Sequence, residues 1–407
     1  MDRDSRFLLK CIRKYYKEHS PILPERFTRR EFGFMYFGRN MMQRHLAFAN
    51  EAELWRFVAS NVPAHCYYST AYYRHPAAPT MEEKDWLGAE LIFDLDADHL
   101  EGAENMTYPE MLREIRTEMI KLCDSYIFDD FGFNYEDVDI TFSGGRGYHA
   151  HVTMPDVLTL GSHERREIVD YIMGSGLDID WVFPYKHLAT STFKTNVGSR
   201  TNVTKFREIP SASSSGWRKR MRSGLVDVVD DFCDMDVKYI RSTYPSIRRS
   251  RPATIEDIQN DVRSSRKVLF ERNSMATMDK KSQDMLVKIM DMDMRPRLSG
   301  DVDAPVTADI KRLIRLPHSV HGKGGLKVIP LSRDELTDFE PLEMAVPDEY
   351  SDDPVEITVR GKVDLKIKDE RFVLKGETEV PEYAAVFLIG RRYATLGKES
   401  EQEKSLF

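Results

Sequence analysis

The sequence has little cysteine and no long hydrophobic run. Its cysteines are Cys11, Cys66, Cys123 and Cys233. They stand far apart and form no Cys-x-x-Cys pair, so they indicate neither a zinc site nor a disulfide framework. No apolar stretch approaches the roughly 20 residues of a membrane span, and the first residues lack the apolar core of a signal peptide. We therefore expect a protein of the reducing cytoplasm with no membrane association.

Positive charge is also in deficit. The chain has 59 Lys and Arg against 67 Asp and Glu, which gives a formal net charge of -8 over 407 residues. This balance argues against binding nucleic acid over the whole surface and leaves local basic patches for that purpose. The composition is otherwise that of a globular protein, long enough for two domains or one large elaborated domain.

Helical and strand patterns are interspersed along the chain, which predicts an α/β (α+β) fold. Residues 5–18 and 111–127 have helical spacing, 356–374 alternate as in strands, and 381–392 are predicted to be a final helix. The middle of the chain is predicted to be a mainly helical insertion into the core. The expected limits are 1–204 for the first part of the core, 205–295 for the insert, 296–397 for the second part of the core and 398–407 for a charged tail.

The first motif with chemical content is the stretch Glu90-Leu-Ile-Phe-Asp94-Leu-Asp96-Ala-Asp98. Its apolar run is typical of a buried strand, and alternation along a strand places Asp94 and Asp96 on the same face. Two adjacent carboxylates repel each other, and a divalent cation such as Mg²⁺ resolves that conflict because it prefers carboxylate oxygens. A polar strand end with solvated acids is the alternative.

The second motif is Ser143-Gly-Gly-Arg-Gly-Tyr-His149, between two predicted strands. Its glycines let the backbone approach a ligand and expose N–H groups, and Arg146 carries donors suited to phosphate oxygens. Ser143 and His149 add further donors. The pattern is not the usual P-loop. A tight hairpin with Arg146 as ordinary surface charge is the alternative.

The third motif runs from Asp303 to Lys323, with a helix predicted from Ala308 to Arg315. Asp303 could complete a metal site, and three carboxylates with two divalent ions would suit nucleotidyl transfer. Arg315, His321 and Lys323 are cations that could receive a triphosphate. A helix-capping role for Asp303 and a solvated basic loop are the alternatives, and Asp301 and Asp309 compete for the role of the third acid.

Taken in order, these three motifs resemble the small, catalytic subunit of archaeal and eukaryotic DNA primases, and most closely the archaeal members. The resemblance runs across most of the chain and includes Arg30-Glu31-Phe32 and Tyr72-Tyr-Arg74. It implies a primase-type catalytic core of mixed sheet flanked by helices, with the acids on the sheet. It also implies synthesis of short RNA primers from NTPs on single-stranded DNA. Because archaeal relatives often extend DNA as well as RNA, use of dNTPs is expected too.

The resemblance assigns roles to single residues. Asp94 and Asp96 match the family's metal-binding acid pair and Asp303 matches its third acid, so these three would hold Mg²⁺ or Mn²⁺. The residues expected around the incoming triphosphate are Ser143, Arg146, His149, Arg315, His321 and Lys323. Some relatives have Lys in place of Arg315, and Gly145 stands where some eukaryotic relatives have Arg.

Other expectations concern metals and partners. Many relatives carry a Cys/His zinc knuckle soon after the acid pair, but residues 99–108 contain no cysteine, so we predict no structural zinc. Family members work with a large, iron–sulfur-containing subunit, and we expect a heterodimer in which that partner holds the cluster. The cluster Arg248, Arg249 and Arg251 is a candidate for template contacts, a solvated face being the alternative.

Two other functions fit part of this pattern. One is a stand-alone primase-polymerase of the same superfamily, acting in repair or on a mobile element. The other is a catalytically silent scaffold that binds nucleic acid, although such a binder has no use for three converging carboxylates.

Overall fold

The computed structural model describes residues 1–100, 102–195 and 198–397. The chain divides into two compact units. The first contains Met1–Phe128, Gly132–Val169 and the residues from Asp301 onward, and the second contains Asp129–Phe131 and Asp170–Gly300. Helices and antiparallel sheets make up both units, which confirms the predicted α+β class. The predicted tail, 398–407, lies outside the described residues.

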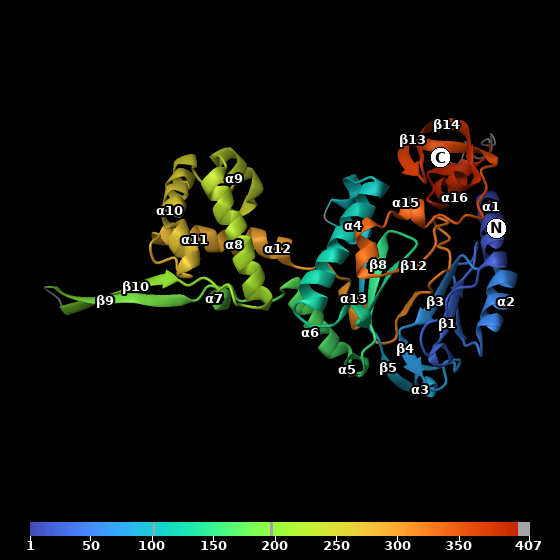
Figure 1. The fold of residues 1–407 in the computed structure, drawn as a ribbon, viewed down its shortest axis with the longest axis horizontal. Helices are drawn as coiled ribbons and strands as arrows, with labels where there is room; N and C mark the ends of the chain where they lie inside the picture. Colours follow the sequence, from blue (N-terminus) through green and yellow to red (C-terminus); the bar gives the residue numbers. More distant parts are fainter. Residues whose placement is uncertain (101, 196–197, 398–407) are drawn as a thin grey trace. The chain divides into compact units, whose positions relative to one another are not determined.

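A four-stranded antiparallel sheet forms the centre of the first unit (Figure 1). Its strands, in spatial order, are β12 (Ile329–Leu331), β7 (Val138–Phe142), β8 (Gly147–Val152) and β6 (Leu91–Asp96). The apolar residues of β6 are buried, as the run Leu91-Ile-Phe93 predicts. Helix α4 (Tyr108–Leu122) packs on β8 and β6 through the apolar face predicted for residues 111–127.

A second antiparallel sheet lies in the same unit. Its strands, in spatial order, are β11 (Leu313–Arg315), β3 (His65–Ser69), β1 (Phe32–Met35) and β2 (Gln43–Leu46). The prediction of a helix from Ala308 to Arg315 is wrong. A short helix, α13 (Ala304–Ala308), ends where that helix was expected to begin, and the following residues pair with β3, Arg315 opposite Tyr67. Strand pairing with a distant segment therefore overrides the local helical pattern.

A buried ion pair lies where β6 begins. The Arg30 guanidinium pairs with the Glu90 carboxylate, and His151 Nδ1 lies 3.0 Å from the other Glu90 oxygen. Burial alone would raise the pKa of Glu90, but Arg30 and His151 lower it to about 2, so the pair is charged. Arg30 also donates to the Ser69 carbonyl at the end of β3. Because an uncompensated buried charge is costly, this network holds the start of β6 in place.

The C-terminal part of the first unit is a small subdomain of its own sheet and one helix. Its strands and helix are β13 (Pro354–Ile367), β14 (Glu370–Pro381), β15 (Ala394–Leu396) and α16 (Glu382–Gly390). Residues 356–374 do alternate as strands, and the helix predicted at 381–392 is α16. Helix α16 is apolar all round and is buried among α1 (Arg3–Glu18), β13 and β15.

Shorter elements complete the first unit. These are α2 (Glu51–Asn61), β4 (Ala71–Tyr73), α3 (Met81–Lys84), β5 (Trp86–Ala89), α5 (Pro155–Leu158), α14 (Arg333–Asp338) and α15 (Pro341–Met344). Helix α6 (Ser162–Met173) runs across the point in the sequence where one unit gives way to the other.

The second unit combines a long hairpin with a group of helices. Its elements are α7 (Ile179–Val182), β9 (Tyr185–Thr195), β10 (Gly198–Arg207), α8 (Gly216–Asp234), α9 (Val237–Thr243), α10 (Pro252–Glu271), α11 (Lys280–Ile289) and α12 (Arg295–Leu298). The main stretch of the unit runs from Asp170 to Gly300, whereas the limits expected from the sequence are 205–295. The hairpin belongs with the helices because a bridge joins Glu208, just past β10, to Ser274.

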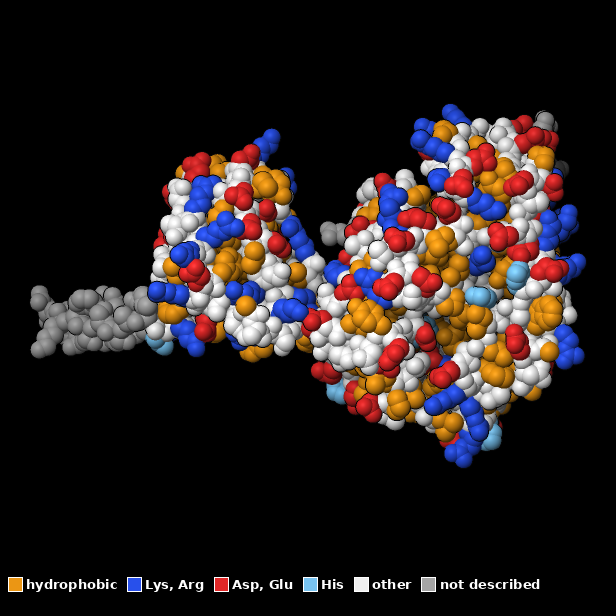
Figure 2. Space-filling model, in the orientation of Figure 1, with side chains coloured by type: hydrophobic (Ala, Val, Ile, Leu, Met, Phe, Trp, Pro, Cys, Tyr) orange, Lys and Arg blue, Asp and Glu red, His pale blue; other side chains and the backbone are white. Residues whose placement is uncertain are grey.

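Acidic and basic side chains are interspersed over the face of each unit that is in view in Figure 2, as the slightly negative composition leads us to expect. Among the helices of the described residues, none is both long and apolar enough to cross a membrane.

Replacing Gly147 with Ala tests how tightly β8 lies against β6. A Cβ at this position would overlap the Leu95 carbonyl oxygen and lie 3.1 Å from Asp96 Cα, both of them backbone atoms. We expect a loss of about 3 kcal/mol in stability, because strand backbone cannot yield as a side chain can. Scanning calorimetry, which resolves the two units if they unfold separately, is the measurement.

Gly145→Ala is the matched control. Its Cβ would meet only side-chain atoms, the nearest being His321 Nε2 at 3.2 Å. We expect this variant to lose less than about 1 kcal/mol. Equal losses for the two variants would contradict the close backbone approach at Gly147.

Candidate active site

One cavity of the first unit brings the three sequence motifs together. Its volume is about 320 Å³. The lining residues are Tyr67, Asp94, Asp96, Asp98, Ser143, Gly145, Arg146, Gly147, His149, Arg312, Leu313, Ile314, Arg315, His321, Lys323 and Arg391. All the site residues predicted from the sequence are in this set except Asp303. Segments that are more than 200 residues apart in the chain therefore meet at one surface.

The register between β6 and β8 sets the relation of the first two motifs. Asp94 lies opposite His149, and Asp96 lies opposite Gly147. Directly opposed residues of antiparallel strands project to the same face, and His149 Nε2 accordingly lies 3.3 Å from Asp94 Oδ1. The acid pair and the glycine turn thus form adjacent walls of the cavity.

Asp303 lies beside the acid pair. Its backbone N–H donates to the Asp94 carbonyl oxygen over 2.9 Å. Burial, together with the nearby charges of Asp96 and Asp303, raises the pKa of Asp94 to about 7. Asp303 also caps α13, since its Oδ1 accepts from the Val306 N–H at 3.1 Å. The capping alternative is therefore observed, and it coexists with the position next to Asp94.

These carboxylates are chemically suited to a divalent cation. Within the described part of the chain, no group of three His, Cys, Asp or Glu side chains is arranged to hold a metal ion by itself. Mg²⁺, however, is usually bound by one or two carboxylates together with substrate phosphates rather than by a closed protein cage. Burial raises the pKa of Asp94, and repulsion from Asp96 and Asp303 outweighs the opposing effect of Arg312 and His151. The residues present therefore fit a metal ion that arrives with a nucleotide.

The glycine turn presents Arg146 to the cavity. Gly144 has a φ of +71°, and a Cβ there would lie 2.8 Å from His321 Cβ. The turn is closed by the Ser143 N–H, which donates to the Gly147 carbonyl over 3.0 Å. The Arg146 guanidinium forms an ion pair with Asp98, the last residue of the first motif, to which the sequence analysis assigned no role. Asp98 follows Asp94 and Asp96 at the same spacing of two, which is the signal that could have found it.

The two predicted site histidines are buried and uncharged. Burial lowers the pKa of His149 well below its usual value, and His151 and Arg315 lower it further. Burial likewise lowers the pKa of His321, with Arg315 next in effect. At neutral pH both rings are therefore hydrogen-bonding groups rather than cations. On each ring Nδ1 is buried and finds no hydrogen-bond partner among the described residues.

Two further cations of the cavity were missed by sequence reasoning. Arg312 lies just before β11, and Arg391 follows α16. Of the five Lys and Arg side chains in the lining, Arg146 alone is paired with a carboxylate of the described residues. Arg315 packs over the Tyr67 ring with 4.5 Å between its Cζ and the ring centroid. Burial lowers the pKa of Arg315, and its Nη1 makes no hydrogen bond within the described chain. The cavity therefore has an excess of unpaired donors for an anion.

Comparison with known proteins identifies the family to which this arrangement belongs. The family model for the DNA primase small subunit matches residues 93–333. The chain is 41% identical to the DNA primase small subunit PriS of Methanocella arvoryzae, an alignment that covers 96% of this chain and 98% of the relative. It is also 41% identical to PriS of Methanosarcina mazei, over 98% of both chains, and 36% identical to PriS of Picrophilus torridus, over 93% and 94%.

The chain belongs to the DNA primase small subunit family. The resemblance inferred from the three motifs is thereby confirmed, including its closeness to archaeal members. The individual site residues stay predictions. So does the absence of structural zinc at residues 99–108, of which residue 101 lies outside the described residues.

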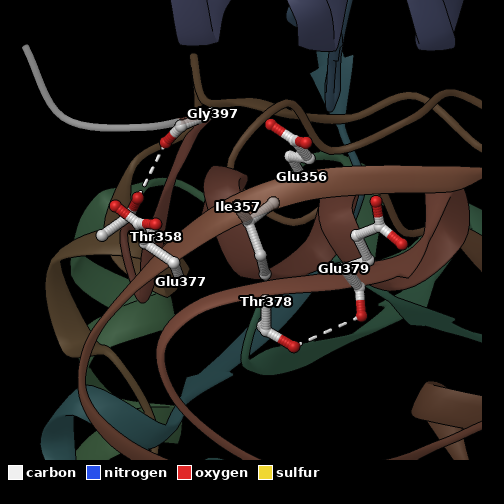
Figure 3. Close-up of a pocket in the computed structure, with 7 residues that line it drawn as sticks. All are labelled: Glu356, Ile357, Thr358, Glu377, Thr378, Glu379 and Gly397. Carbon is white, nitrogen blue, oxygen red and sulfur yellow. Dashed lines mark hydrogen bonds between the residues drawn. The ribbon is translucent and has the colours of Figure 1, made fainter.

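A second cavity of the first unit differs from the first in the charge of its lining residues. It has a volume of about 190 Å³ in the C-terminal sheet (Figure 3). Its described lining residues are Glu356, Ile357, Thr358, Glu377, Thr378, Glu379 and Gly397. Three carboxylates and no Lys or Arg in this set would repel a triphosphate. The cavity that contains Asp94 and Arg146 differs from it in having Lys and Arg side chains beside its carboxylates.

Replacing Asp94 with Asn tests the crowding of the acids. In metal-free protein at about pH 8 Asp94 is ionised in both the folded and the unfolded state, and its burial opposes folding. We expect the Asn variant to be more stable than wild type by about 2 kcal/mol at that pH. As the pH falls through about 7 the folded wild type takes up a proton, so the advantage shrinks and vanishes near pH 4.

Urea unfolding in the presence of EDTA, repeated between about pH 8 and pH 5, measures this difference. An advantage that grows as the pH falls would contradict a raised pKa for Asp94. Asp309→Asn is the control, because Asp309 lies outside the cavity lining, and it should show no such pH dependence.

Proposed function

We propose that this chain is the catalytic subunit of a DNA primase, which synthesises short RNA primers on single-stranded DNA by two-metal nucleotidyl transfer. Extension with dNTPs is part of the proposal. The observation that carries it is the meeting, in one cavity, of an acid pair with five Lys and Arg side chains. A nucleoside triphosphate with its divalent ions needs both kinds of group at once.

The family relation supports this function over the two alternatives. The similar proteins carry the printed name DNA primase small subunit, which favours neither a stand-alone primase-polymerase nor a silent scaffold. A scaffold would also gain nothing from a carboxyl group such as that of Asp94, whose burial opposes folding.

In the proposed reaction Asp94, Asp96 and Asp303 hold Mg²⁺ or Mn²⁺. When bound, these ions lower the pKa of the attacking 3′-hydroxyl and offset charge on the leaving pyrophosphate. Asp94 would bind the ion as the carboxylate, so metal binding would be coupled to loss of its proton. Its neighbour His149, 3.3 Å away, is uncharged at neutral pH and is placed to hydrogen-bond either the carboxylate or a phosphate oxygen.

The basic residues of the cavity orient the triphosphate. Arg146 exchanges its ion pair with Asp98 for phosphate oxygens. Arg315 and Lys323 stabilise the developing negative charge on the pyrophosphate, while Ser143 and His321 donate hydrogen bonds to it. No covalent intermediate with the protein is required, because both reacting groups belong to the nucleotides.

The name small subunit implies a primase complex. We propose that its other member is a large, iron–sulfur-containing subunit that assists initiation, and that the template is held by phosphate contacts. Arg248, Arg249 and Arg251 are exposed on the second unit and stay candidates for such contacts. Binding of this kind is salt-sensitive and weakly selective for sequence.

Synthesis on unprimed single-stranded DNA with labelled NTPs and Mn²⁺ tests the function directly. Wild type should make short products, and Asp96→Asn should reduce their rate at least about a hundredfold because one metal ligand becomes neutral. Extension of supplied primers without initiation would indicate that the large subunit is needed to start. No incorporation with or without that subunit would overturn the proposal.

The choice of the third acid has its own test. Asp303→Asn keeps the cap of α13, since Asn caps helices as well as Asp does, but removes the negative charge beside Asp94. We expect at least about a hundredfold loss of synthesis rate with little change in the melting temperature. Asp301→Asn and Asp309→Asn are the matched controls. Activity that depends on either of these and not on Asp303 would move the third-acid role to that residue.

A further inference from the structure

The C-terminal subdomain contributes a cation to the cavity from outside the part of the chain that the family model matches. Arg391 follows the last residue of α16, and its backbone N–H donates to the Phe387 carbonyl over 2.9 Å. The matched region ends at residue 333. The side chain of Arg391 lines the same cavity as Arg146 and Lys323.

Close backbone packing fixes the end of α16 against the loop that carries Lys323. A Cβ at Gly390 would lie 3.1 Å from the Lys323 carbonyl carbon and 3.1 Å from the Gly324 nitrogen. A Cβ at Gly325 would overlap Val386 of α16. The end of the helix and the loop are therefore closely packed, in part backbone against backbone. This packing fixes the position of Arg391 relative to the loop.

The Arg391 side chain is itself held in place. Its Cζ lies 4.6 Å from the centroid of the Tyr108 ring, and the Tyr108 hydroxyl donates to the Gly145 carbonyl in the glycine turn. A guanidinium that packs on an aromatic face keeps its in-plane donors available for an anion. Arg391 is therefore coupled both to the glycine turn and to the loop of Lys323.

Part of this cation lacks a partner. Arg391 Nε is buried and makes no hydrogen bond with any described residue. A buried donor without an acceptor is costly, and a bound anion removes that cost. Arg315 Nη1 of the same cavity is in the same condition, and His321 Nδ1 there is also buried without a hydrogen-bond partner among the described residues. Donors from β11, the loop after it and the end of α16 thus surround one space.

We infer that Arg391 is a nucleotide-binding residue that donates to the triphosphate of the incoming nucleotide, and that the C-terminal subdomain completes the active site by seating it. This inference rests on the proposed function, since it places a nucleoside triphosphate in this cavity. The competing possibility is that Arg391 serves only to pack on Tyr108.

Equilibrium binding separates these roles without requiring catalysis. Titration calorimetry with ATP and with AMP, each with Mg²⁺, compares wild type with Arg391→Gln. A charged hydrogen bond to the triphosphate predicts about tenfold weaker ATP binding and less than about a twofold change for AMP. In primer synthesis the KM for NTPs should rise by a similar factor, with a smaller change in kcat.

Two more variants complete the design. Arg392 is exposed and adjacent, so Arg392→Gln is the matched control and should leave ATP binding and synthesis within about twofold of wild type. Arg391→Lys keeps the charge but loses the forked donor geometry, so it should retain part of the affinity. If Arg391→Gln lowers the melting temperature enough to impair folding, Arg391→Lys replaces it in the comparison of ATP with AMP binding.

Unchanged ATP affinity in Arg391→Gln, or equal losses for ATP and AMP, would overturn the assignment and leave Arg391 a packing residue. Wild type that binds ATP through Arg391 but makes no primer with its large subunit would contradict the proposed function alone. Wild type that binds no ATP even with that subunit would overturn both.

Discussion

The pairing of β6 with β8 is the constraint on which the site depends. It places Asp94 opposite His149 and Asp96 opposite Gly147, so the acid strand and the glycine turn share one face. The missing side chain at Gly147 permits this approach, because a Cβ would overlap the Leu95 carbonyl. A shift of register by one residue would turn both carboxylates away from the cavity. The ion pair between Arg30 and Glu90 holds the start of the same strand.

The site is electrostatically incomplete without a ligand. Burial, together with repulsion from Asp96 and Asp303, raises the pKa of Asp94 to about 7, while Arg315 and Arg391 carry buried donors that find no acceptor among the described residues. Each group would be stabilised by the opposite part of a metal–triphosphate complex. These buried groups lower the stability of the folded protein, but they are already in position for a ligand. Such preorganisation is what electrostatic catalysis requires.

Local patterns predicted much of the fold. The helix expected at 111–127 and the strand that begins at Leu91 are present because their apolar residues repeat with the period of the element they form. The helix expected from Ala308 to Arg315 is absent, since β11 pairs with β3 across more than 200 residues of sequence. The second unit also includes residues before the expected start of the insert at 205, since the β9–β10 hairpin joins the helices through contacts that no local pattern signals.

For the site, the sequence by itself predicted which kinds of residue meet in the cavity. Asp-x-Asp on a strand, a glycine turn with Arg146 and a basic loop after Asp303 are local patterns, and together they sufficed to predict the family. Spacing left Asp301, Asp303 and Asp309 open and the family resemblance favoured Asp303. The tertiary structure shows that Asp303 lies beside Asp94, that His149 and His321 are uncharged, and that Arg391 reaches the cavity. Burial and proximity set charge states and neighbours, and both arise only when distant segments pack together.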